Sequence, residues 1–177
     1  MYLRILAIVA IFNLSLARVL LLPICALSAA GFVVCAVQYW WRAGSEKQPA
    51  QAMQVATSGN PLELGTAAIF AGLFVAVSLA TVLVKSQLGV SGIYALAAVV
   101  GISDIDPFVL NLAQGGVAGV ANATLAAAIL IAGSSNNILK AAYAAGFAGG
   151  KATSASAAVL VALALAGFAA AYGLIMQ

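Results

Sequence analysis

Long apolar stretches, separated by short polar segments, run along almost the whole chain. They extend over about twenty residues or more without strict alternation, which is typical of membrane-spanning helices and not of a barrel. The pattern predicts five spans, at residues 16–41, 62–84, 90–114, 117–139 and 154–176, and a polar loop at 43–61. We therefore expect an all-α, polytopic helical membrane bundle that forms a single transmembrane domain over residues 1–177.

A shorter apolar stretch precedes the first predicted span. Residues 1–12 carry Arg4 and are followed by Asn13 and Ser15. A stretch of this length cannot cross a bilayer, so we expect a short N-terminal interfacial or re-entrant helix. The alternative is a signal peptide, in which Arg4 supplies the basic region and Ser15-Leu16-Ala17 the cleavage site.

The third predicted span is interrupted by the segment Gly101-Ile-Ser-Asp-Ile-Asp-Pro107. On a continuous helix, Asp104 and Asp106 would point about 200° apart, at about 100° per residue. Pro107 disfavours helical geometry at Asp106, and residues i and i+2 of an extended segment share a face. The sequence therefore predicts that this span is broken near residues 101–107, with both carboxylates on one side.

The composition agrees with a membrane protein. Hydrophobic residues make up 65% of the 177 and charged residues 6%, whereas soluble domains have about 45–50% apolar and about 25% charged residues. The seven Lys and Arg residues are scattered singly, which argues against a nucleic-acid partner. With five crossings, their distribution predicts a cytoplasmic amino terminus. Cys25 and Cys35 are about 15 Å apart along one predicted helix, too far for a disulfide.

The interrupting segment also carries the main candidate chemistry. Asp104 and Asp106 are two of only four acidic residues, and an ionisable group at membrane depth costs about 2.5–3.5 kcal/mol on insertion scales. Two carboxylates, the Ser103 hydroxyl and the carbonyls of an unwound segment would form a hard-oxygen site. We predict that Asp104 and Asp106 bind Mg²⁺ or another hard cation, with proton linkage. The alternative is a solvated turn in which Asp106-Pro107 merely starts a helix.

A second polar cluster, Gly133-Ser-Ser-Asn-Asn-Ile-Leu-Lys140, closes the fourth predicted span. Ser134, Asn136 and Asn137 could add oxygen ligands, and Lys140 could supply the counter-charge, because acids at membrane depth are normally paired. The alternative is a frayed helix end from which Lys140 reaches the headgroups.

The chain resembles the carboxyl-terminal transmembrane domain of unknown function found in long bacterial members of the MgtC/SapB family. The resemblance rests on Tyr2-Leu-Arg4, Asn60-Pro61-Leu-Glu-Leu, Gly92-Ile-Tyr-Ala-Leu-Ala, Gly101-Ile-Ser-Asp-Ile-Asp and Ser135-Asn-Asn-Ile-Leu-Lys140. It implies a multi-pass protein of the bacterial inner (plasma) membrane, and a separately encoded MgtC-like subunit as a candidate partner. Pro107 departs from the small residue expected at its position.

These observations lead to one functional hypothesis and one rival. We expect a cation transporter or channel-like protein in which Asp104 and Asp106 bind the ion. The rival is a non-catalytic accessory or regulatory subunit of a larger membrane complex. The chain has no His and no motif nucleophile, so it does not indicate an enzyme. Its expected surroundings are the lipid bilayer and either further copies of itself, as a homo-oligomer, or a partner membrane protein.

Overall fold

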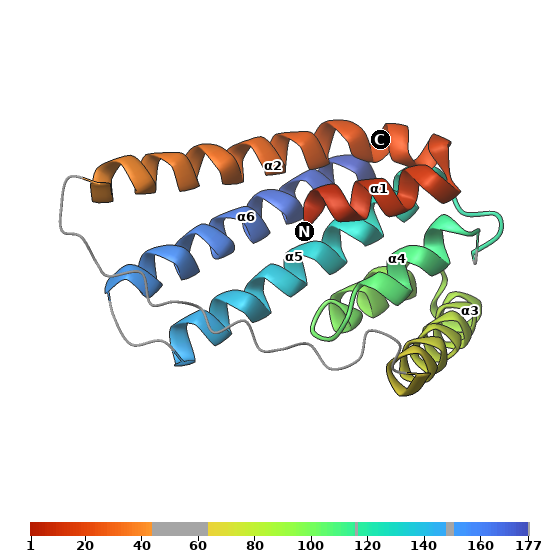
Figure 1. The fold of residues 1–177 in the computed structure, drawn as a ribbon. Coiled ribbons are helices and arrows are strands. Elements are labelled where there is room, and N and C mark those ends of the chain that lie inside the picture. The colour runs from red at the N-terminus through yellow and green to blue at the C-terminus, as the bar shows by residue number, and fades with distance from the viewer. Residues whose placement is uncertain (44–63, 116, 148–150, 177) are drawn as a thin grey trace.

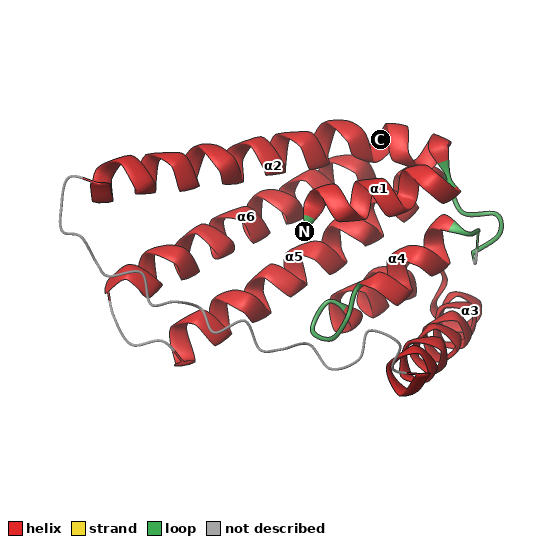
Figure 2. Cartoon of the chain, viewed as in Figure 1, coloured by secondary structure: helices red, strands yellow, loops and turns green. Residues whose placement is uncertain are grey.

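The computed structural model describes residues 1–43, 64–115, 117–147 and 151–176. Within these ranges the chain forms helices and no strand (Figure 1, Figure 2). The helices are α1 (Tyr2–Phe12), α2 (Leu14–Ala43), α3 (Leu64–Val100), α4 (Asp106–Ala113), α5 (Asn122–Phe147) and α6 (Lys151–Ile175). This confirms an all-α bundle, with α2, α5 and α6 lying side by side along their length.

Four helices are long and apolar enough to cross a membrane: α2, α3, α5 and α6. The sequence predicted five spans, whereas the described part of the chain has four helices of this kind. The reason is that α3 does not end between the predicted spans 62–84 and 90–114, where a turn at 85–89 was expected. It continues through these residues to Val100. Only Gly89 leaves helical geometry there, with φ 62° and ψ −143°, a left-handed conformation that favours glycine. The expected turn is thus a kink inside one long helix.

The predicted interruption of the third span is confirmed. Helix α3 ends at Val100 and α4 begins at Asp106, with residues 101–105 outside helical structure. Pro107 lies in the first turn of α4, where its missing N–H costs no helical hydrogen bond. Helix α4 turns back against α3, so residues 90–113 form a hairpin of two short helices, hereafter the hairpin.

Helix α1 is the expected short N-terminal helix. It ends before Asn13, whose side-chain oxygen accepts a hydrogen bond from the Leu16 N–H at 3.0 Å and so caps the start of α2. Ile5 and Val9 of α1 are buried. This side of the helix packs against α2 and α4, whereas Leu3, Ile11 and Phe12 are exposed.

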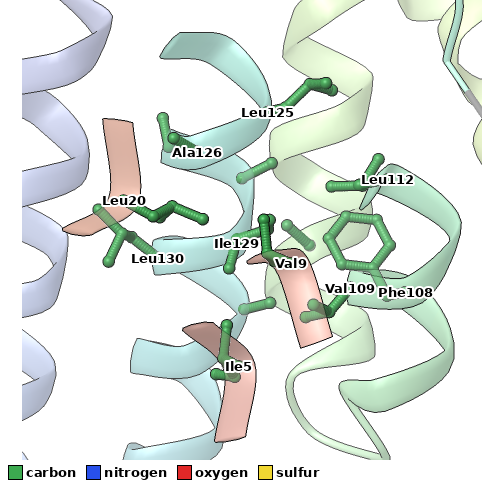
Figure 3. Close-up of a cluster of buried hydrophobic side chains, with 14 of the residues drawn as sticks. Ile5, Val9, Leu20, Phe108, Val109, Leu112, Leu125, Ala126, Ile129 and Leu130 are labelled. Carbon is green, nitrogen blue, oxygen red and sulfur yellow. The ribbon is translucent and has the colours of Figure 1, made fainter. Parts of the chain in front are cut away.

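The hydrophobic core lies where α1, α2, α4 and α5 meet (Figure 3). Phe108 and Val109 of α4 project toward Val9 of α1 and Ile129 of α5. Helix α5 is the central element, because it is by far the most buried of the four candidate spans. Its alanine-rich sequence permits the close approach of neighbouring helices.

Helix α5 also differs from the predicted fourth span at 117–139. It starts later, at Asn122, and continues to Phe147. The polar cluster at residues 133–140 consequently lies in the middle of a helix, and the interpretation of Lys140 as part of a frayed helix end is wrong. The alanine-rich segment after Lys140 is a strong helix former, which explains the extension.

Candidate functional site

Three helix ends meet beside the middle of α5. They are the amino end of α1, the carboxyl end of α3 and the amino end of α4, each joined to α5 or to one another by side-chain contacts. Ser134 is the middle residue of the α5 span Asn122–Gly146. When α5 spans the bilayer, the meeting point therefore lies near its centre. We call this group the polar centre: Tyr2, Arg4, residues 101–106, and Ser135 to Lys140.

Two neighbouring residues of α5 bind the turn of the hairpin. Ser135 Oγ donates a hydrogen bond to the carbonyl of Ala98 at 2.7 Å, and Asn136 Nδ2 donates to the carbonyl of Gly101 at 3.0 Å. Gly101 approaches so closely that a Cβ atom there would lie 2.5 Å from the Ala132 carbonyl oxygen. The predicted proximity of Asn136 to the acidic segment is thus present, but Asn136 acts as a donor to the backbone.

The carbonyl groups at the end of α3 are satisfied in the same region. The N–H groups of Gly101, Ile102 and Ser103 donate to the carbonyls of residues 97, 99 and 100 at 3.0, 3.1 and 2.9 Å. Together with the two α5 contacts, this accounts for one hydrogen bond to each carbonyl from 97 to 101. We expected free carbonyls to help bind a cation. These five residues do not provide them, because each of their carbonyls already accepts a hydrogen bond. The exposed segment 102–104 and the carboxylates are the remaining oxygen donors of the turn.

The two acids have different surroundings. Asp104 is exposed, and its Oδ1 accepts a hydrogen bond from the Asp106 N–H at 3.1 Å. As in the alternative of a solvated turn, Asp106-Pro107 starts helix α4, but the residue at the N-cap is Ile105. Asp106 is partly buried and forms an ion pair with Arg4, in which Nη2 and Oδ1 are 2.8 Å apart. The amino end of α4 adds favourable electrostatics for a carboxylate at Asp106.

Sequence reasoning missed Arg4 as the partner of Asp106. The two residues are 102 positions apart, so no local pattern joins them. Lys140, the predicted counter-charge, directs its amine to Met1 Sδ at 3.4 Å instead. One signal was available: Arg4 is the only charged residue in the apolar stretch 1–12, and a cation in such a position calls for a buried or partly buried acid.

The other predicted residues are divided between several contacts. Asn137 is buried and its Nδ2 donates to the Tyr2 hydroxyl at 2.7 Å, which fixes the amino end of α1 to α5. Ser134 is buried against Gly167 of α6. Ser103 is exposed on the hairpin turn. The structure therefore brings Asn136 and Asn137 to the acidic segment and to α1, and directs Ser134 elsewhere.

The acids could hold a cation only with help from water or from the ion's own shell. Among the described residues, no cluster of three or more His, Cys, Asp or Glu side chains is arranged to hold a metal. Mg²⁺ fits such a sparse set best, because it keeps several waters and is often bound through one or two carboxylates. Arg4 contacts Oδ1 of Asp106, so a cation at this carboxylate would compete with the guanidinium.

We predict that Asn136→Ala will lower stability by about 1–3 kcal/mol, because the buried carbonyl of Gly101 loses its donor. Thermal unfolding in detergent, followed by circular dichroism, measures the loss. Ser103→Ala is the matched control on the exposed side of the same turn and should leave the midpoint unchanged. Equal midpoints for Asn136→Ala and the native chain would show that the Asn136 contact does not hold the hairpin to α5.

Comparison with known proteins identifies one family. The family model described as Domain of unknown function (DUF4010) matches residues 1–148. The matched region includes α1, the hairpin and α5, and so contains every residue of the polar centre. No curated protein and no solved structure matches the chain.

Proposed function

Because this chain belongs to the DUF4010 family, whose function is unknown, we propose its function from the polar centre: a transporter or channel-like protein for Mg²⁺ or another hard cation. The observation that carries this proposal is the Arg4–Asp106 ion pair at the meeting point of three helix ends, beside the middle of a spanning helix. Broken helices of this kind bind ions near the bilayer midplane in many secondary transporters.

In the proposed mechanism, Asp106 alternates between two partners. Arg4 neutralises it when no ion is present, and an arriving cation or proton displaces the guanidinium. Asp104 provides a second carboxylate on the same turn. We expect proton linkage as well, because a proton and the cation would compete for the same carboxylate. The resemblance to the membrane domain of long MgtC/SapB proteins makes Mg²⁺ the first ion to test.

The experiment is cation flux into proteoliposomes that contain the purified chain. We expect Asp104→Asn combined with Asp106→Asn to abolish flux, because the amide cannot neutralise a cation. Lys85→Gln is the matched control, since Lys85 lies outside the polar centre and contacts the carbonyl of Ala118. Unchanged flux in the double Asn variant, with a folded protein, would refute the proposal.

An accessory or regulatory subunit is the second candidate, and helix α3 favours it. Most residues of the apolar span Ala67–Val100 are exposed or half-buried within the chain. That surface could contact a second copy or a partner membrane protein such as a separately encoded MgtC-like subunit, as well as lipid. This candidate predicts that a membrane protein co-purifies with the chain and that the double Asn variant keeps the partner.

A further inference from the structure

A groove with a volume of about 430 Å³ lies between α2 and α6 and is open to the outside. Its α2 side runs from Leu27 through Gly31 and Cys35 to Gln38, and its α6 side from Leu163 to Ser156. The amino end of α1, with Tyr2, contributes to the lining as well. None of the described side chains that line it is charged, and the lining residue Met1 also bears the amino-terminal group. The groove is separate from the hairpin and its acidic turn.

The groove has the depth of one membrane leaflet. Gln38 is the last residue of the α2 span Leu14–Gln38, and Leu27 lies next to the middle of that span. Eleven residues of helix correspond to about 16 Å, and half of the hydrocarbon core of a bilayer is about 15 Å. Ser156 and Leu163 of α6 lie at matching positions, near the start and near the middle of the span Ala155–Ile175.

The polarity of the groove changes along the same direction. Its outer end has the amide of Gln38 and the hydroxyl of Ser156, which lie at the ends of the two apolar spans. Its inner part is lined mainly by aliphatic side chains, among them Leu27 and Leu163. Gly31 has no side chain that would fill the groove. A Cβ atom at this position would already be in contact with α6, 3.6 Å from Leu163 Cδ1. Apart from the buried hydroxyl of Ser28, the α2 and α6 side chains of the inner part are apolar. A mainly apolar slot about one leaflet deep is complementary to a hydrocarbon chain that enters from the membrane surface.

We propose that this groove binds one acyl chain of a phospholipid. The bound chain reaches the bilayer centre beside Tyr2, whose hydroxyl accepts the hydrogen bond from Asn137. The lipid therefore supports the amino end of α1, the element that also carries Arg4. This inference does not depend on the proposed cation function, because it uses neither Asp104 nor Asp106.

The two native cysteines allow a direct test. Cys35 lines the groove, whereas Cys25 is exposed on the same helix outside it. The single-cysteine variants Cys25→Ser and Cys35→Ser are purified in detergent, stripped of lipid and reacted with an N-alkylmaleimide, with and without added phosphatidylglycerol. We expect the phospholipid to slow the reaction of Cys35 at least threefold and to leave the rate at Cys25 unchanged. No protection, or equal protection at both cysteines, would overturn the proposal.

A second measurement separates bound lipid from the general lipid surface. Electron spin resonance of a chain-labelled phospholipid should show a motionally restricted component with the native protein. Gly31→Phe fills the groove and should remove that component, whereas Ala29→Phe, on the exposed side of α2, should retain it. If both variants retain it, the restricted lipid lies elsewhere and the groove is not its site. Cation flux in the same samples tests the other proposal separately.

Discussion

Replacing Gly101 by valine should separate the hairpin from α5. A Cβ atom at this position would lie 2.5 Å from the Ala132 carbonyl oxygen and 2.6 Å from Ser135 Cβ. The Ala132 carbonyl belongs to the backbone of the central helix and cannot move away cheaply. Overpacking and the loss of the two α5 hydrogen bonds to the hairpin together amount to about 2–4 kcal/mol. We expect the thermal midpoint to fall by roughly 5–15 °C.

Gly146→Ala is the matched control for this prediction. Gly146 lies near the carboxyl end of α5, and a Cβ atom there would meet nothing within 4 Å. Alanine is the better helix former, so the control should leave the midpoint unchanged or raise it slightly. Measured in the same detergent, a Gly101→Val protein as stable as this control would mean that the hairpin does not touch α5 as described.

Removing Arg4 should free Asp106 for a cation. We expect Arg4→Gln to strengthen cation binding about tenfold, the equivalent of about 1.4 kcal/mol, because the ion no longer competes with the guanidinium. The same change should lower stability in the absence of the ion by about 1 kcal/mol. This loss of stability is small for a charged hydrogen bond because water screens the ion pair: the Arg4 side chain is 59% exposed and that of Asp106 22%.

A double-mutant cycle isolates the ion pair. Arg4→Gln with Asp106→Asn should be less destabilising than the sum of the single changes, because no charge is left without a partner. Arg18→Gln, at an exposed arginine of α2, controls for the loss of a positive charge. Cation affinity is measured by isothermal titration calorimetry and stability by thermal unfolding. An Arg4→Gln protein with unchanged or weaker affinity would show that Arg4 does not compete for the carboxylate.

The sequence predicted the break in the third span because the cause is local. Gly101 and Ser103 weaken the helix before the break, and Pro107 favours a new helix start, so residues 101–105 leave helical structure. Asp106 itself is the first residue of α4, so the expectation that Pro107 keeps it out of helical geometry is wrong. The end of α1 before Asn13 is likewise local, since Asn13 caps the following helix. In each case a few adjacent residues contain all of the physical information that is needed.

Other features depend on distant parts of the chain. The Arg4–Asp106 pair requires that α1 and the hairpin end at the same place, which no window of sequence reveals. The polar residues Lys85, Ser86 and Gln87 suggested a turn, yet they remain in α3, and Lys85 reaches the carbonyl of Ala118. Similarly, α5 continues through the polar cluster because the polar side chains at 134–137 are buried or half-buried against neighbouring elements. A polar segment inside a membrane protein can mark a contact as well as a loop.

The hairpin has a consequence for sidedness. Its two short helices enter and leave on one side, so residues 90–113 add no crossing, and the same holds for α1. The four candidate spans of the described residues, α2, α3, α5 and α6, make an even number of crossings, whereas the five predicted spans made an odd one. An even number puts the turn at Asn13 and the end of α6 on the same face of the membrane. Reporter domains attached after α6 and inserted at 44–63 should therefore report opposite faces.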